Sequence, residues 1–186
     1  MPALFVYMGT IAEVTKKFTS YADGFNNEIN KAVKDNENII RELQLDQFAT
    51  GLDNRGKPLS PNYDNDPYFA EKADNMNARQ KVKTSAKILS DAYKKWKWDI
   101  RPQAQLVPFP QRSISMPNLY INGTFWSTVY AKAIKDGWEI GGTWAETPEM
   151  EAKYRTLFGM SPESKNYFIQ NILIPALNKY MNTKLK

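Results

Sequence analysis

The most regular hydrophobic pattern lies near the amino end of the chain. Apolar residues recur there at steps of three and four positions: Ile11, Val14, Phe18, Tyr21, Phe25, Ile29 and Val33. This spacing places them on one side of a helix, so it predicts a long amphipathic helix that ends near Asp35–Asn36. Thr10 and Glu13 have the spacing of a capping box at its start.

The pattern changes after this helix. Residues 39–45 alternate partly between apolar and polar side chains, which we interpret as a short strand leading into a turn at residues 46–48. Residues 51–58 are dense in turn-forming residues and suit a tight turn with Gly56 in the left-handed region. Residues 60–69 are polar and aromatic, and we expect an ordered loop there.

A second helical pattern is basic. Its apolar positions are Ala78, Val82, Ala86, Leu89, Tyr93 and Trp96. Lysine and arginine residues fall largely between them, which predicts one basic amphipathic helix that stops before Arg101–Pro102. The segment 102–117 has no helical period and is rich in proline, so we expect an extended connection.

The last third of the chain combines strand and helix signals. Residues 128–135 have strand composition, Asp136–Gly137 is the strongest hairpin signal of the chain, and residues 138–142 supply the returning strand. Proline after a capping hydroxyl predicts a short helix at 147–158 and a final helix from Ser161. Pro175 should kink or loosen that final helix.

These elements predict an α+β fold with a long N-terminal helix, a small antiparallel sheet with a hairpin near 128–142, and a C-terminal helix. The 186 residues suit one domain, 1–186. We expect its core in about residues 9–58 and 117–185, with the basic helix and the proline-rich segment, about residues 72–116, as an insertion. No apolar run approaches the roughly 20 residues of a membrane span, so we expect no membrane contact.

Composition narrows the chemistry. The chain has neither cysteine nor histidine, which excludes disulfides, thiolate nucleophiles, Cys/His zinc sites and histidine-dependent catalysis. Carboxylates at Asp53, Asp64 and Asp66 are of the type that holds Ca²⁺ or Mg²⁺, and with a divalent ion they are the candidates for an enzyme. Turn chemistry explains these residues more simply. We therefore expect no catalytic residue, no cofactor and no metal.

The net charge is +5, and the positive excess gathers in one stretch. Its residues are Arg79, Lys81, Lys83, Lys87, Lys94, Lys95, Lys97 and Arg101. Such a stretch either forms a solvated helix face or attracts a polyanion. We take these side chains as candidate contacts for DNA or an acidic protein partner. Sequence-independent nucleic-acid binding by the basic helix 79–101 is the alternative function, and its affinity would fall with salt.

Aromatic residues are the candidates for a subunit interface. The chain has 5 tryptophans and 10 tyrosines, and core packing is the ordinary role of such residues. Tryptophan and tyrosine are also enriched where proteins meet. The residues we expect at an interface are Phe5, Tyr7, Tyr63, Tyr68, Phe69, Phe109, Trp126 and Trp144.

Four motifs, in order, carry a resemblance to a known family. They are Gln47–Leu59 followed by Pro61-Asn62-Tyr63, Asn118–Val129, Asp136–Gly141, and Leu157–Glu163. Their order resembles that of phage virion-morphogenesis proteins, the tail-completion or tail-terminator proteins of Mu-like and lambdoid phages, and looks closest to structural proteins of Bacteroides phages, including the crAss-like group. The similarity touches most of residues 40–185.

The resemblance implies a non-catalytic virion protein, a ring, connector or completion subunit at the phage head–tail junction. It implies a homo-oligomeric ring with other phage neck, portal or tail proteins as partners, and genomic DNA in the channel as a further contact. The N-terminal segment 2–7 and the aromatic loops would meet neighbouring subunits. Assembly would take place in the host cytoplasm.

Overall fold

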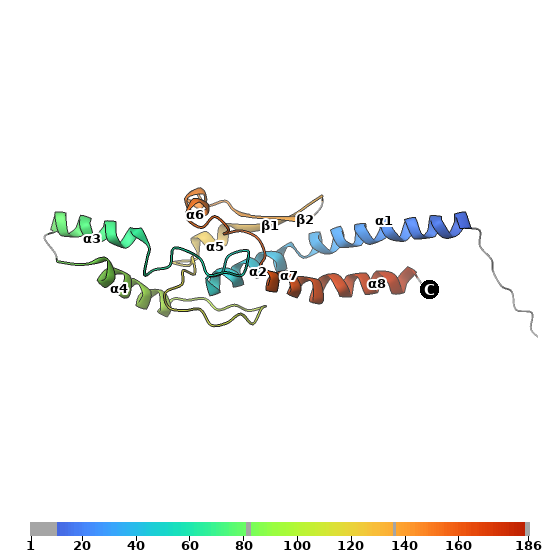
Figure 1. Cartoon of the computed structure of the whole chain (residues 1–186). Helices are drawn as coiled ribbons and strands as arrows, with labels where there is room; N and C mark the ends of the chain where they lie inside the picture. Colours follow the sequence, from blue (N-terminus) through green and yellow to red (C-terminus); the bar gives the residue numbers. More distant parts are fainter. Residues whose placement is uncertain (1–10, 81–82, 136, 185–186) are drawn as a thin grey trace, which may run out of the picture.

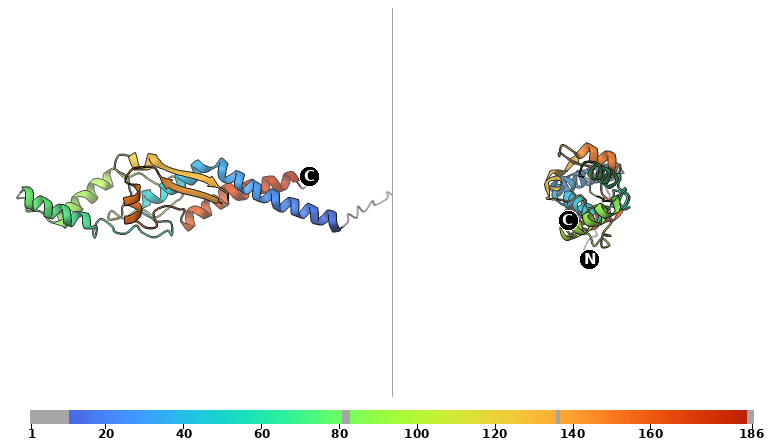
Figure 2. Two further views of the ribbon diagram at one scale, coloured as in Figure 1. Left: turned by 90° about the horizontal axis from the view of Figure 1, so that it is seen from above. Right: turned by 90° about the vertical axis from the view of Figure 1, so that its left-hand side faces the viewer.

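The computed structural model describes residues 11–80, 83–135 and 137–184 (Figure 1). The molecule is long and narrow, and a pair of helices projects from each end of a central body (Figure 2). Across the described residues the secondary structure consists of helices and one two-stranded antiparallel sheet, which confirms the predicted α+β class. Over the described ranges, no helix is both long and apolar enough to span a membrane.

One end is formed by α1 (Ile11–Asp35) and the C-terminal helices, and we call it the helical arm. The end of α1 at Asp35 is as predicted, while the capping threonine Thr10 lies outside the described residues. The rings of Phe25 and Tyr180 meet edge to face, with their centroids 5.8 Å apart, and join α1 to α8 (Ile174–Lys184).

The C-terminal helix is continuous but changes its winding. α7 (Pro162–Phe168) is capped by Ser161, whose hydroxyl accepts the N–H of Ser164, as the sequence predicts. The π-helical turn η1 (Ile169–Leu173) follows, and the N–H of Ile174 donates to the carbonyl five residues back. Because Pro175 has no N–H for an ordinary helical turn, this wider turn directly before it confirms the predicted loosening.

The central helix of the body is α2 (Glu37–Thr50), so the strand predicted at residues 39–45 is wrong. The physical reason is that polar residues of α2 are buried by hydrogen bonds to distant backbone. Gln44 Oε1 accepts the N–H of Gly159 at 2.8 Å, and Asp46 Oδ2 accepts that of Leu106 at 2.7 Å. Residues 43–49 of α2 are all buried, so this part of the helix is enclosed on every side and its apolar residues alone show no helical period.

The predicted hairpin is confirmed. β1 (Val129–Ile134) follows the short α5 (Thr124–Thr128) and pairs with β2 (Gly137–Gly142), with Val129 opposite Gly142. Turn residue Asp136 lies outside the described residues. The predicted helix 147–158 exists as the shorter α6 (Thr147–Lys153).

Two hydrophobic clusters share α2. One holds Leu45, Phe48, Leu59, Phe125, Val129, Tyr154 and Leu157. The other holds Val33, Ile40, Leu43, Val107, Met160 and Phe168, and reaches from the body into the helical arm. Residues 102–117 contribute Val107 without forming a helix or strand, as predicted for an extended connection.

The opposite end is a hairpin of two helices, α3 (Pro67–Gln80) and α4 (Ala86–Asp99). The prediction of a single basic helix across 78–101 is therefore wrong, and α3 begins inside the loop predicted at 60–69. Two local caps explain the break. The amide of Asn77 exchanges two 2.9 Å hydrogen bonds with the backbone of Thr84, and Ser85 accepts the N–H of Ile88 as the N-cap of α4.

Candidate functional site

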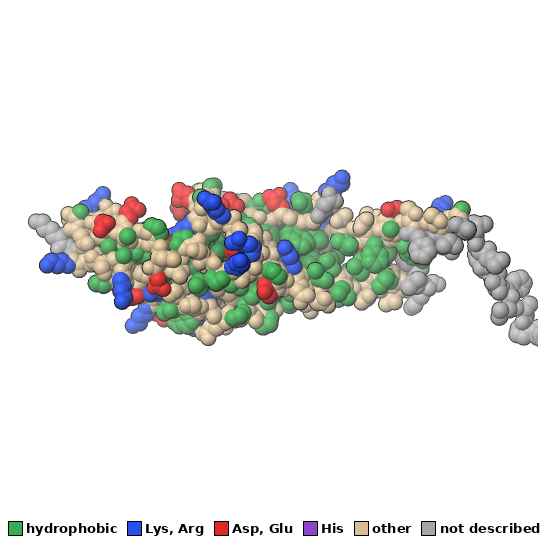
Figure 3. Space-filling model, in the orientation of Figure 1, with side chains coloured by type: hydrophobic (Ala, Val, Ile, Leu, Met, Phe, Trp, Pro, Cys, Tyr) green, Lys and Arg blue, Asp and Glu red, His purple; other side chains and the backbone are tan. Residues whose placement is uncertain are grey.

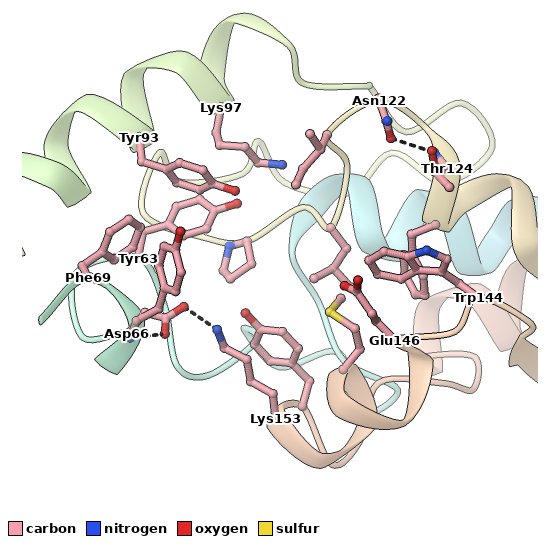
Figure 4. Close-up of a pocket in the computed structure, with 17 residues that line it drawn as sticks. Tyr63, Asp66, Phe69, Tyr93, Lys97, Asn122, Thr124, Trp144, Glu146 and Lys153 are labelled. Carbon is pink, nitrogen blue, oxygen red and sulfur yellow. Dashed lines mark hydrogen bonds and ion pairs between the residues drawn. The ribbon is translucent and has the colours of Figure 1, made fainter. Parts of the chain in front are cut away.

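A cavity of about 580 Å³ lies where the α3–α4 hairpin meets α5, α6 and the segment before α5 (Figure 4). We call it the aromatic pocket. Seven aromatic side chains line it: Tyr63, Tyr68, Phe69, Tyr93, Phe125, Trp144 and Tyr154. A concave, mostly apolar site with a few polar groups is the usual form of a binding pocket.

One wall of the aromatic pocket is held together by ring contacts. Tyr63 precedes α3 and its N–H donates to the carbonyl of Ser115 at 2.9 Å. Tyr93 projects from α4, and its ring centroid lies 5.2 Å from that of Tyr63 and 5.4 Å from that of Phe69. Burial raises the pKa of Tyr63 well above its usual range and that of Tyr93 to about 12, so both hydroxyls stay protonated at neutral pH.

The amine of Lys97 is the most unusual polar group of this pocket. The residue is 1% exposed, and its ammonium donates to the carbonyl of Tyr120. Burial, together with the positive charge of Arg112, lowers the pKa of Lys97 to about 7. A neutral amine is therefore abundant here at neutral pH, in contrast to an exposed lysine.

Two carboxylates near the pocket, Asp64 and Asp66, are compensated by lysines. Asp66 pairs with Lys153 of α6 at 2.5 Å and also accepts the N–H of Tyr68 (Figure 4). Asp64 is paired with Lys94, whose hydrogen bond lowers the pKa of this exposed carboxyl. These two acids thus serve as anchors between elements, as turn and cap residues do.

Asp53 lies apart from the aromatic pocket and organises the turn after α2. Its carboxylate accepts the N–H of Lys57 at 2.8 Å and the hydroxyl of Thr156 at 2.7 Å. Burial raises the pKa of Asp53, but these hydrogen bonds outweigh burial and lower the pKa. Within the described ranges, no three acidic side chains lie close enough together to hold a metal ion.

The basic residues predicted as one contact face are dispersed by the structure. Lys97 is buried, and Lys94 pairs with Asp91 at 2.8 Å as well as with Asp64. The guanidinium of Arg101 stacks on the ring of Trp98 at 3.9 Å. Lys81 lies outside the described residues. Four of the predicted side chains are exposed: Arg79, Lys83, Lys87 and Lys95.

The aromatic residues predicted at an interface also separate. Tyr63 and Phe69 are buried in the pocket wall, whereas Tyr68 is 49% exposed at its rim. Trp144 lines the pocket. Trp126 and Phe109 pack against the two hydrophobic clusters. Phe5 and Tyr7 lie outside the described residues.

The sequence did not single out Tyr154, Lys153 or Glu146 of this pocket, and it gave Tyr93 only as an apolar helix position. No local pattern identifies them, because α6 and α4 are brought together by the fold and not by the chain order.

A second exposed feature is an apolar strip on the helical arm, which we call the apolar flank (Figure 3). It contains Ile169, Ile174 and Met181, which are 43%, 38% and 37% exposed. Ile174 and Met181 are seven residues apart on α8 and so lie on the same side of the helix. The exposed polar residue Thr183, nine residues beyond Ile174, lies on the opposite side of the same helix.

No protein-family model, curated protein or solved structure shows a significant match to this chain. The case for its function therefore rests on its motifs and on these surfaces.

Proposed function

We propose that the chain is a non-enzymatic structural subunit of a tailed-bacteriophage virion, a ring, connector or completion protein at the head–tail junction. The observation that carries this proposal is the apolar flank of the helical arm. A projecting pair of helices with exposed isoleucine and methionine side chains is suited to meet a neighbouring subunit.

Two helices bury only the seam between them, so the outer edge of each apolar stripe stays in water. Full burial of an isoleucine or methionine side chain is worth about 1.5–3 kcal/mol. Covering the exposed third or more of Ile169, Ile174 and Met181 would therefore contribute on the order of 1 kcal/mol each. A partner that covers this strip would therefore gain binding free energy from its burial.

The arrangement of surfaces favours a head-to-tail contact. The helical arm lies at one end of the molecule, and the aromatic pocket adjoins the helical hairpin at the other end (Figures 1 and 4). A contact between unlike surfaces of identical subunits is heterologous, and it closes into a ring when the rotation per subunit permits. The four motifs, whose order resembles that of phage morphogenesis proteins, support the same role.

The exposed basic residues of the hairpin are compatible with DNA passing through such a ring or with an acidic neighbour. Arg79, Lys83, Lys87 and Lys95 would contact phosphates without reading sequence. Lys94 and Lys97 are engaged within the protein. We therefore expect weaker nucleic-acid affinity than if all eight predicted basic side chains were free to bind phosphates.

The decisive experiment is quantitative mass spectrometry of purified virions. We expect this chain at a copy number close to that of the portal protein, because each ring position would hold one subunit. Detection in lysates of infected cells but not in mature particles would overturn the proposal.

The role of the apolar flank can be tested separately with the purified protein. If the purified chain assembles alone, we expect the double variant Ile174→Glu/Met181→Glu to have a lower oligomer mass in native mass spectrometry. If assembly requires the portal, we expect the same variant to be missing from the particles. Thr183→Glu is the matched control, since it adds a carboxylate to the opposite side of the same helix. Equal assembly of both variants and the unmodified chain would exclude the apolar flank as the contact.

A further inference from the structure

A smaller cavity of about 280 Å³ lies on α2, at its end, beside α4 and the proline-rich segment. We call it the arginine pocket. Its lining includes Thr50, Trp98, Arg101, Val107, Phe109 and Arg112. Most of its lining residues are apolar, but two like-charged guanidinium groups, those of Arg101 and Arg112, also line it. This combination needs an explanation.

Arg112 is 6% exposed and only one edge of its guanidinium is satisfied. Nη1 donates to the carbonyl of Met116. Nε and Nη2 are buried and have no hydrogen-bond partner in the described structure. These two nitrogens are adjacent on the guanidinium plane, and their parallel N–H groups form the fork that holds two oxygens of one oxyanion.

The charge of Arg112 is also uncompensated. Within the described parts of the chain, neither Arg112 nor Arg101 forms an ion pair with a carboxylate. Asp46, a buried acid four residues before Thr50 in α2, is occupied by the backbone N–H groups of residues 105–107. Unlike Lys97, an arginine does not escape a buried site by losing its proton.

Arg101 places a second cation at the same site. Its guanidinium lies 3.9 Å from the centroid of Trp98, and that of Arg112 lies 5.7 Å from the same centroid. Burial lowers the pKa of Arg112, Tyr63 acts against this shift, and the positive charge of Arg101 lowers the pKa further. Because burying an unpaired charge is costly, two neighbouring cations in a largely apolar site favour the binding of an anion between them.

We propose that the arginine pocket binds a phosphate group, held side-on by the Nε–H and Nη2–H fork of Arg112 and paired with Arg101. A phosphate matches the charge of two guanidiniums better than a singly charged carboxylate does. The cavity also leaves room for the atoms to which a phosphate is esterified. Bulk water does not reach the fork, so the Arg112 side chain must turn toward the cavity to take up the anion. This proposal stands independently of the virion role.

The test measures thermal unfolding of the purified full chain in chloride buffer at constant ionic strength, with added inorganic phosphate. We expect a saturating rise in Tm, on the order of several °C at a hundredfold excess over Kd. Acetate at the same concentration should produce a much smaller rise. No rise with phosphate beyond that of sodium chloride, or an equal rise with acetate, would overturn the proposal.

Variants assign the effect to the site. Arg112→Met should abolish the phosphate-dependent rise and, without phosphate, should be at least as stable as the unmodified chain, because it removes an unpaired buried charge. Should Arg112→Met fail to fold, Arg101→Gln decides instead and should weaken phosphate binding at least tenfold. Arg155→Gln, which removes an exposed arginine elsewhere, is the matched control. Unchanged phosphate affinity in Arg101→Gln would refute the site.

A competition experiment identifies the source of the phosphate. A short single-stranded DNA that displaces inorganic phosphate, and no longer binds the Arg112→Met variant, would identify a nucleic-acid backbone phosphate. Phosphate binding without such competition would identify a free phosphate or a small phosphate ester. Both results retain the site and differ only in its natural ligand.

Discussion

Replacing Lys97 by methionine should stabilise the protein at neutral pH and destabilise it at higher pH. Methionine has a similar length and no charge, so it fills the same space beside the aromatic pocket. The amine has a pKa of about 7 in the folded chain, against 10.5 for an ordinary lysine. The unfolded chain therefore binds more protons than the folded chain between these two values, and stability must rise with pH across that window.

The size of the effect follows from the two pKa values. At pH 7 the unfolded chain is almost fully protonated at this residue and the folded chain is half protonated, which costs folding about 4 kcal/mol. By pH 9.5 the cost falls to about 1.4 kcal/mol, so the unmodified chain should gain about 3 kcal/mol of stability between these pH values. The window ends near pH 10, where unfolded tyrosines begin to ionise while Tyr93 keeps its proton up to about 12.

Lys97→Met removes this cost but also removes the hydrogen bond to the carbonyl of Tyr120. An unsatisfied buried carbonyl costs about 1–3 kcal/mol. The variant should therefore be more stable than the unmodified chain by about 2 kcal/mol at pH 7 and less stable by up to about 1 kcal/mol at pH 9.5.

Urea unfolding followed by tryptophan fluorescence, in phosphate-free buffers from pH 6.5 to pH 9.5, measures both values. Lys95→Met is the control, because Lys95 is exposed one turn or less from Lys97 on the same helix. A constant difference between Lys97→Met and the unmodified chain at every pH would refute the reasoning, since it would mean that the amine does not change protonation in the folded chain.

Two further predictions concern the contacts that hold the body together. Gly51→Ala should destabilise the protein by about 2–4 kcal/mol in the same unfolding assay, because Gly51 has φ of 75° and a Cβ would lie 2.6 Å from the carbonyl oxygen of Pro117; a change below about 1 kcal/mol would contradict it. Gln47→Leu should cost about 2–5 kcal/mol, because it leaves the N–H of Ser161 and the carbonyl of Gly159 buried without their partners at 2.7 and 3.0 Å. Gln170→Leu, on the exposed part of the C-terminal helix, should change stability little and serves as its control.

The sequence predicted elements correctly where the decisive interactions are local. The hairpin of β1 and β2 needs only a turn dipeptide between two runs of strand residues, and the register Ile134 opposite Gly137 follows from that turn. The start of α7 at Ser161 needs only a hydroxyl and the N–H three residues on. Pro175 loosens its helix through its own missing N–H. In each case the cause lies within a few residues of its effect.

Prediction failed where polar residues are buried by partners far along the chain. α2 appeared as a strand because Gln44, Asp46 and Gln47 interrupt its apolar period, yet all three are buried. Their partners are the backbone of residues 105–107 and 157–161. A hydrophobic pattern reports burial only when burial and apolarity coincide, and a buried amide or carboxylate that finds its hydrogen bonds breaks that link.

The candidate sites show the same limit more sharply. Lys97 was counted with the exposed cations of its helix, because nothing within α4 distinguishes it from Lys95. Its burial is created by residues 117–122 and by Arg112, which approach α4 only in the folded chain. Arg112 lies in a proline-rich connection, where an isolated arginine suggests solvent exposure. Arg112 becomes a candidate phosphate ligand only in the folded chain. There, two of its N–H groups have no partner and no described carboxylate pairs with it. The functional candidate is therefore the buried positive charge of Arg112, which no described carboxylate neutralises. The phosphate-dependent rise in Tm, and its loss in Arg112→Met, test this assignment directly.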